Sequence, residues 1–153
     1  MASESFRREV VVGSDRQTAW QVLTEVDSLV DWIGIIDELD QQAYLERYSA
    51  VLMDRIGPFK LRADLDISVS DVVEGERLRV RASGEDRQVS SRIEIDVVLT
   101  VSENGGGPVT VVVDGSYQVT GKVATMGSGM IRQKATKVLD EFVARAGARL
   151  GTV

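Results

Sequence analysis

The side chains that could do chemistry in this sequence are carboxylates, tyrosine hydroxyls and methionine thioethers, because histidine and cysteine are both absent. Without histidine, the chain lacks the commonest general base and the commonest metal ligand. Without cysteine, it has neither disulfides nor thiolate nucleophiles, and it suits a reducing compartment. Catalysis or metal binding would therefore depend on clustered carboxylates.

The carboxylates are poorly arranged for either task. Asp64 and Asp66 share one face of an alternating strand, but this is the polar face, where solvated carboxylates are commoner than an acid/base pair. Asp37, Glu38 and Asp40 lack the spaced loop with a terminal glutamate that binds calcium. We therefore predict no catalytic residue, no metal site and no intrinsic cofactor.

Two tyrosines and two methionines are better suited to contact a ligand. Tyr48 and Tyr117 each carry a hydroxyl that could bind a polar head group. Met126 and Met130 carry adaptable apolar side chains that either accept ligands of variable shape or fill the core. The glycines between the two methionines permit movement, but they lack the pattern of a phosphate-binding loop.

The composition is that of one globular domain covering residues 1–153, with 43% hydrophobic and 27% charged residues. A formal net charge of −6 argues against binding nucleic acid, which needs a dense basic face. Basic residues gather between positions 121 and 150, either as a solvated helix face or as a docking surface for a membrane or partner. The sequence has no signal-peptide pattern, and no run of about 18 apolar residues could span a bilayer.

The N-terminal part of the sequence predicts one strand followed by two short helices. Residues 6–12 form the predicted strand. Ser14 or Asp15 can cap the first helix, and Asp27 or Ser28 can cap the second. Two short helices directly after a single strand are uncommon, which narrows the choice of fold.

The rest of the sequence predicts about six antiparallel strands and one long helix. Over residues 61–69 apolar and polar side chains alternate strictly, so one face of that strand is buried and the other is solvated. The same alternation returns at residues 77–82, 93–101 and 109–119. Residues 129–150 place apolar side chains at steps of three and four, which is typical of an amphipathic helix.

A curved antiparallel sheet with one solvated face must cover its other face, and only the C-terminal helix is long enough to do so. The sequence therefore predicts an α+β helix-grip fold, in which the sheet wraps around the long helix and the two short helices close one end. In this fold we expect the following side chains to be buried: Leu65, Ile67, Val97, Leu99, Val138 and Phe142.

The inward-facing side chains are mostly small or medium in size, and aromatic residues make up only 5% of the chain. Either the sheet lies close to the helix, or an apolar cavity remains between them; we favour a cavity, the usual form of a small-ligand site. The apolar turn at residues 56–59 and the two methionines would form its entrance. The predicted ligand-contacting residues are Trp32, Ile36, Ile56, Phe59, Ala63, Leu65, Ile67, Val80, Val97, Leu99, Val111, Val113, Tyr117, Met126, Met130 and Ile131.

Two segments carry a resemblance to a known family. The first is RIGPFK at residues 55–60, which leads into the alternating strand, and the second is residues 117–131, which contain GKVATMGSGMI. Together with the apolar C-terminal helix, they make the chain similar to the CoxG family of carbon monoxide dehydrogenase. This family lies within the larger group of Bet v 1 and START-type helix-grip (SRPBCC) proteins. The resemblance covers essentially the whole chain.

The resemblance implies an accessory protein that recruits aerobic carbon monoxide dehydrogenase to the cytoplasmic face of the membrane, where electrons from CO oxidation enter the respiratory chain. The implied partners are the dehydrogenase complex and, peripherally, the inner face of the cell membrane. Together with the predicted cavity, this suggests a bound menaquinone, ubiquinone or lipid, with a quinone preferred. Two alternatives remain open: an adaptor with a filled core and no ligand, and an aromatase- or cyclase-like enzyme that uses Tyr48 and Tyr117.

Overall fold

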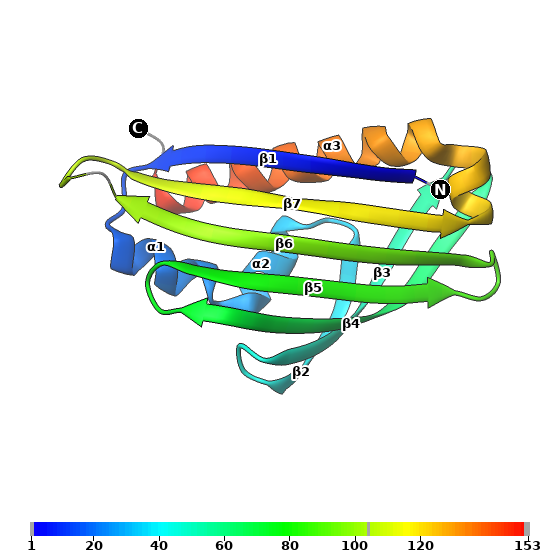
Figure 1. Ribbon diagram of the computed structural model, residues 1–153, viewed down its shortest axis with the longest axis horizontal. Helices are drawn as coiled ribbons and strands as arrows, with labels where there is room; N and C mark the ends of the chain where they lie inside the picture. The colour runs from blue at the N-terminus through cyan, green and yellow to red at the C-terminus, as the bar shows by residue number, and fades with distance from the viewer. Residues whose placement is uncertain (1, 104, 152–153) are drawn as a thin grey trace.

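In a computed structural model, the described residues 2–103 and 105–151 form one seven-stranded antiparallel sheet and three helices (Figure 1). The elements are β1 (Ala2–Val12), α1 (Arg16–Leu23), α2 (Val26–Trp32), β2 (Ile36–Ala43), β3 (Arg47–Ile56), β4 (Phe59–Val73), β5 (Arg77–Asp86), β6 (Ser91–Glu103), β7 (Val109–Gly121) and α3 (Lys122–Leu150). The predicted order of one strand, two short helices, six strands and a long helix is confirmed.

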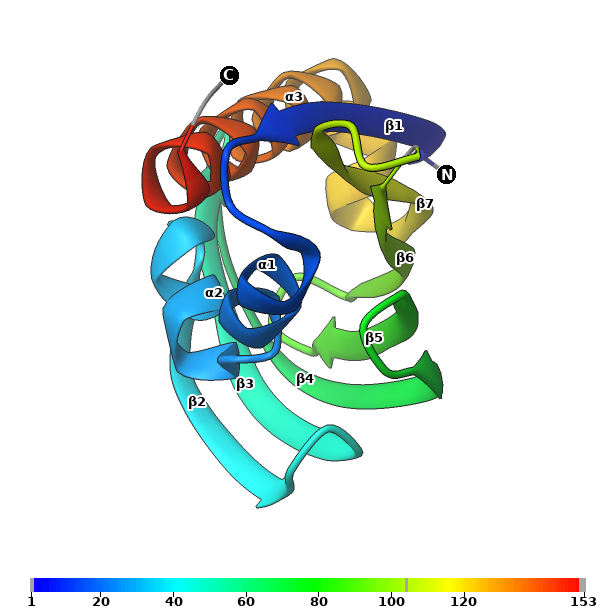
Figure 2. The same ribbon diagram turned by 90° about the vertical axis from the view of Figure 1, so that its left-hand side faces the viewer.

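The strands lie in the order β1-β7-β6-β5-β4-β3-β2, so the N-terminal strand pairs with the last one. The strands from β2 to β6 each pair with the next strand in the sequence, as short turns between antiparallel strands allow. Figure 2 shows the sheet curling around α3, with α1 and α2 at one end of the curled sheet. The predicted helix-grip fold is therefore confirmed. Within the described residues, no helix is long and apolar enough to cross a membrane.

Glycine permits close contact between strands at two positions. A Cβ atom on Gly115 of β7 would collide with the backbone oxygen of Asp96 in β6, and one on Gly84 of β5 would collide with the backbone oxygen of Asp64 in β4. A side chain at either position would therefore push the strands apart. Gly115 also leaves the centre of the concave face without a side chain.

The long helix begins earlier than predicted, at Lys122 instead of Gly129. Its backbone leaves helical geometry at Gly127, where φ is −138° and ψ is 25°, so a short first segment meets the main helix at a kink. Ile56 packs closely there, since a Cβ atom on Gly127 would lie 2.9 Å from its Cγ2 atom. The apolar stripe predicted the helix but could not show that helical turns precede the glycines.

The two short helices begin in different ways. Asp15 caps α1, because its carboxylate accepts a hydrogen bond from the backbone N–H of Thr18 at 2.7 Å, and this bond lowers the pKa of Asp15. The predicted cap of the second helix is wrong: α2 begins at Val26, and the preceding Glu25 makes no capping hydrogen bond. The position of α2 depends instead on tertiary packing of its buried residue, Trp32.

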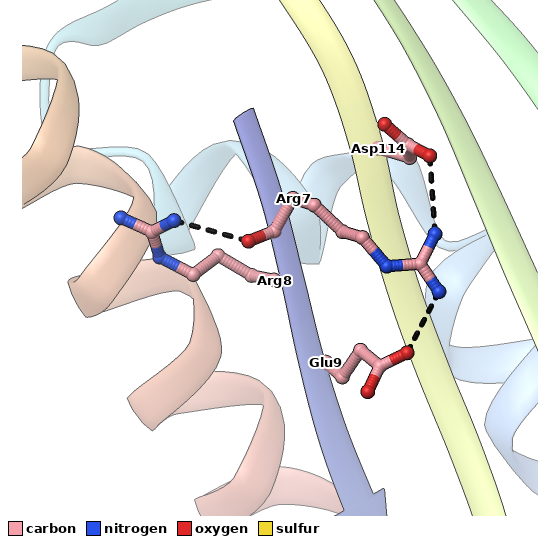
Figure 3. A network of polar contacts seen from close by, with 4 residues as sticks. All are labelled: Arg7, Arg8, Glu9 and Asp114. Atoms are coloured by element: carbon pink, nitrogen blue, oxygen red, sulfur yellow. Dashed lines mark hydrogen bonds and ion pairs between the residues drawn. The ribbon is translucent and has the colours of Figure 1, made fainter. Parts of the chain in front are cut away.

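The edge strand β1 carries several charged side chains. Arg7 binds Glu9 at 2.7 Å and Asp114 of β7 at 3.1 Å (Figure 3). Arg8 donates a hydrogen bond to the backbone oxygen of Arg7 at 3.0 Å and pairs with Asp140 of α3 at 3.4 Å. These solvent-accessible pairs contribute little to stability, but charged residues on an edge strand hinder pairing with a second sheet.

The interior is packed as two separate apolar clusters, which lie toward opposite ends of the curled sheet. The first cluster, beside α1, α2 and the end of α3, includes Val12, Trp20, Leu23, Trp32, Leu99, Val113, Phe142 and Ala146. The second cluster, beside the start of α3, includes Ala2, Ile56, Leu61, Ala63, Leu65, Ile93, Val119 and Ile131. The boundary between the two clusters lies in the middle of the concave face.

Candidate ligand-binding site

The middle of the concave face is a band of partly buried side chains that crosses five strands. The pairing register aligns two rows of inward-facing residues there. The first row is Glu4, Tyr117, Ile95, Ala82 and Ile67, and the second row is Phe6, Gly115, Val97, Val80 and Val69. Except for the buried Ala82, all of these residues are half-buried. We call these two rows the central band.

The rows on both sides of the central band are more completely buried. Toward the start of α3, the next row is Ala2, Val119, Ile93, Gly84 and Leu65, and all five are buried. Toward the other end, Val113, Leu99 and Leu78 are buried. The centre of an interior is normally its best packed part. Here the centre is less buried than the two ends.

The facing surface of α3 shows the same pattern. Ile131 and Phe142 are buried, whereas Ala135, Val138 and Leu139, which lie between them on the apolar stripe, are half-buried. The helix and the sheet therefore bury each other less completely at this level than at either end.

This pattern corrects part of the predicted core. Leu65, Leu99 and Phe142 are buried as predicted. The prediction that Ile67, Val97 and Val138 are buried is wrong: all three are half-buried, Ile67 and Val97 in the central band and Val138 on the facing stripe of α3. Alternation along a strand predicts which face a side chain points to, but not how closely the facing layer packs on it.

Charge pairs connect α3 to β1, at one edge of the curled sheet, and to β3, near the other edge. Arg132 pairs with Glu4 of β1 at 2.8 Å, in addition to the contact between α3 and β1 at Arg8. On the other side, Lys134 pairs with Asp54 of β3 at 3.1 Å, and the Asp54 side chain is only 14% exposed. Since each cation is matched by an anion, these pairs add no net charge beside the central band.

Tyr117 brings a hydroxyl group to the central band. Among the described residues, this hydroxyl has no hydrogen-bond partner. Burial raises the pKa of Tyr117, and the Glu4 carboxylate raises it further, against the opposing effect of Arg132. The hydroxyl therefore stays protonated at neutral pH and is available as a donor.

Tyr48, the other tyrosine predicted to offer a hydroxyl, has a structural role. Its side chain is 1% exposed, and its hydroxyl accepts a hydrogen bond from the backbone N–H of Leu45 at 2.6 Å. Burial raises the pKa of Tyr48, so this hydroxyl also stays protonated at neutral pH. The hydroxyl holds the β2–β3 turn and is not free to bind a ligand in the way that the Tyr117 hydroxyl is.

The predicted ligand-contacting residues lie in several places. Those in the central band are Ile67, Val80, Val97 and Tyr117. Those in the first apolar cluster are Trp32, Leu99, Val111 and Val113. Those in the second cluster, or packed against it, are Ile36, Ile56, Phe59, Ala63, Leu65 and Ile131. Met126 and Met130 are exposed. Sequence reasoning missed Phe6, Val69 and Ile95, whose place in the band follows only from strand register.

The two parts of the predicted entrance lie side by side. The backbone N–H of Gly57 donates a hydrogen bond to Sδ of Met130 at 2.7 Å, and Ile56 packs on Gly127. Ile56 is buried and belongs to the second cluster, whereas the methionines face solvent. The apolar turn and the start of α3 therefore form one continuous part of the surface.

The outer face of the sheet has a different chemical character. Its recesses, of about 600 to 630 Å³, are lined mainly by charged and short polar side chains. At the centre, Arg79 binds Asp96 at 2.8 Å, and this contact lowers the pKa of Asp96. The Asp64 and Asp66 side chains are exposed on the same face. Among the described residues, no three or more His, Cys, Asp or Glu side chains are grouped so that they could hold a metal ion.

Several solved structures share this fold. A conserved protein from Geobacillus kaustophilus is 19% identical, with 97% of this chain and 94% of that chain covered and a TM-score of 0.78. A START superfamily protein from Mycobacterium smegmatis is 13% identical, with 98% and 97% covered and a TM-score of 0.63. Truncated norcoclaurine synthase from Thalictrum flavum is 11% identical, with 99% and 96% covered and a TM-score of 0.63. At these identities, the likeness shows the fold alone.

Sequence comparison is more specific. No curated protein matches the chain. Residues 9–151 match the family model that describes CoxG, the G subunit of carbon monoxide dehydrogenase.

Proposed function

The chain belongs to the CoxG family of carbon monoxide dehydrogenase, and on this basis we propose that it is an accessory protein that binds a neutral apolar molecule, preferably a respiratory quinone, in the central band. The observation that carries the proposal is the incomplete burial of both facing layers between two well-packed clusters. A long apolar ligand would complete this packing, since each buried methylene contributes about 0.8 kcal/mol. The proposed role is binding and requires no catalytic residue.

The charges beside the band favour a neutral ligand over an anionic phospholipid. Arg132 is already paired with Glu4, so a phosphate head would have to compete with a carboxylate for the guanidinium group. A quinone is neutral, and its carbonyl oxygens accept hydrogen bonds. The free hydroxyl of Tyr117 can donate to such a carbonyl. We therefore place the quinone head near Tyr117 and its apolar tail along the aliphatic part of the band.

The link to carbon monoxide dehydrogenase follows from the family. Electrons from CO oxidation must reach a quinone that is dissolved in the hydrocarbon of the membrane. A protein at the inner face of the membrane that takes up the quinone in an apolar site would bring it to the dehydrogenase. Recruitment of the dehydrogenase and carriage of the quinone are then two parts of one role.

Organic extraction of the purified protein, followed by mass spectrometry, tests this proposal. We expect a menaquinone or ubiquinone, according to the host, in an amount comparable to that of the protein. Recovery of phospholipid in place of quinone would overturn the assignment of quinone as the ligand, but it would still support an apolar binding site. If neither is found, and quinone added to the protein is not retained, an adaptor without a ligand becomes the better account.

The substitution Tyr117→Phe tests the position of the quinone head. It should weaken quinone binding by about tenfold, because one hydrogen bond contributes about 1 kcal/mol or slightly more. Stability should change by less than about 0.5 kcal/mol, since the hydroxyl has no hydrogen-bond partner among the residues that the structure describes. Quinone titration followed by tryptophan fluorescence, together with thermal unfolding, measures both effects.

The matched control is Tyr48→Phe. It removes the hydroxyl that binds Leu45, so it should lower stability and leave the quinone affinity unchanged. Equal quinone affinity in the parent and the Tyr117→Phe variant would show that the head group does not bind at Tyr117.

A further inference from the structure

Three chain segments form one end of the molecule. These are the β3–β4 turn at residues 57–58, the β5–β6 turn at residues 87–90 and the start of α3 at residues 122–130 (Figure 1). Hydrogen bonds join them: Gly57 donates to Met130, and the backbone N–H of Lys122 donates to the backbone oxygen of Ser90 at 3.2 Å. We call this surface the tip.

The tip exposes large apolar side chains. Met126 is 65% exposed and Met130 is 41% exposed. Pro58 is exposed at the end of the hairpin beside them, and Phe59 is half-buried. Apolar groups that gather on one surface and stay outside the core mark an interaction site.

The free charges around the tip are basic. Arg55 and Lys60 face each other across the hairpin, and Lys122 lies at the start of α3. All three side chains are exposed, and none makes an ion pair with any described residue. This contrasts with the formal net charge of −6 for the whole chain.

The acidic side chains near the tip are already engaged. Asp54 pairs with Lys134, and Glu85 pairs with Arg87 at 3.3 Å. Asp86 is buried and accepts hydrogen bonds from the backbone N–H groups of Arg62 and Gln88. The tip therefore presents an apolar centre surrounded by unpaired cations. The three neighbouring carboxylates are all engaged within the protein and do not offset these cations.

We propose that the tip docks on an anionic lipid surface, with Met126, Met130 and Pro58 among the head groups and the three unpaired cations against lipid phosphates. Basic side chains next to apolar ones suit the interface of an anionic bilayer. The acidic remainder of the molecule is repelled by the same surface, so the field orients the tip toward the membrane. This inference rests on the proposed function, because a carrier of a membrane quinone needs one defined face toward the bilayer.

Flotation with vesicles that contain no quinone tests the docking alone. The parent should bind phosphatidylglycerol vesicles, bind phosphatidylcholine vesicles far more weakly, and lose binding as salt is raised. The triple variant Arg55→Glu, Lys60→Glu, Lys122→Glu should bind phosphatidylglycerol on the order of a hundredfold more weakly. The variant Met126→Gln should bind both kinds of vesicle more weakly, because it removes the most exposed apolar side chain.

The matched control is the triple variant Arg47→Glu, Arg77→Glu, Lys137→Glu, which has the same net charge. It changes exposed residues away from the tip that make no ion pair within the described part of the chain. It should weaken vesicle binding by less than about threefold, since salt screens charges beyond about 10 Å. Equal loss in both triple variants, or no binding by the parent, would overturn the proposal. The proposal would also be overturned if the parent bound purified carbon monoxide dehydrogenase but no vesicles, and a tip variant no longer bound the dehydrogenase. The tip would then be an interface with a protein.

Quinone titration in detergent solution separates this inference from the proposed function. The triple variant Arg55→Glu, Lys60→Glu, Lys122→Glu should keep the parent's quinone affinity, because its substitutions lie outside the central band and outside the predicted ligand-contacting residues. If the parent does not bind quinone, the proposed function is contradicted. If the parent does not bind phosphatidylglycerol vesicles more tightly than phosphatidylcholine vesicles, the docking is contradicted.

Discussion

Replacing Val97 with tryptophan should abolish quinone uptake from vesicles while the protein stays folded. Val97 lies in the middle of the central band, between Gly115 of β7 and Val80 of β5, and it is half-buried. An indole ring there would occupy the space of about three or four ligand methylenes, so affinity should fall on the order of a hundredfold. Because the layers are not closed at this level, the larger side chain should cost less than the roughly 1–3 kcal/mol typical of overpacking a tight core.

The neighbouring substitution Val98→Trp is the matched control. Val98 is the next residue on β6, is also half-buried, and points to the outer face. The Val98→Trp variant should take up as much quinone as the parent. Uptake is measured by separating the protein from the vesicles and extracting the quinone that it carries. If the Val97→Trp variant also retains full uptake, the ligand does not bind in the central band, and the carrier proposal fails.

Ala63 and Val113 are unsuitable for this test, although both were predicted to contact the ligand. Ala63 is 0% exposed, and Val113 is also buried. Each belongs to one of the packed clusters, so a tryptophan at either position would strain the core itself. If such a variant did not bind quinone, the cause would be a disrupted core and not a blocked binding site.

Phe142→Ala should lower the free energy of unfolding by about 3–5 kcal/mol, the usual cost of removing a buried phenylalanine. Phe142 is 8% exposed and belongs to the first apolar cluster. Its ring meets that of Trp32 edge to face, with the centroids 5.5 Å apart, and so connects α3 to α2. Urea unfolding followed by circular dichroism measures the change.

Val138→Ala, one turn earlier on the same helix, is the control for the loss at Phe142. Val138 is only half-buried, so its truncation should cost clearly less, about 1 kcal/mol or below. A cost at Val138 equal to that at Phe142 would mean that the layers are as well packed at the central band as at the end.

The sequence could predict the order of the elements and the face to which each strand residue points. Both depend on local patterns, such as the alternation from Leu61 to Val69 and the apolar stripe of α3. It could not predict that Ile67 is half-buried while Leu65, two residues earlier on the same face, is buried. That difference depends on the distance between the sheet and α3, which no local pattern encodes.

Two features of the candidate site depend on long-range register. Phe6 enters the central band because β1 pairs with β7 so that Phe6 lies opposite Gly115. The Glu4–Arg132 pair beside Tyr117 depends on the same register and on the placement of α3. Neither the strand pairing nor the free state of the Tyr117 hydroxyl could be predicted from the order of residues along the chain.

The pairing of β1 with β7 has a consequence for synthesis on the ribosome. Val10 lies opposite Val111, so β1 finds its partner only after the roughly 100 residues between the two strands have been made. Until then β6 forms an open edge of the growing sheet, which could pair with another nascent chain. Contacts so distant in sequence also form slowly. The completed sheet and its covering helix can therefore form only after β7, and then α3, have left the ribosome.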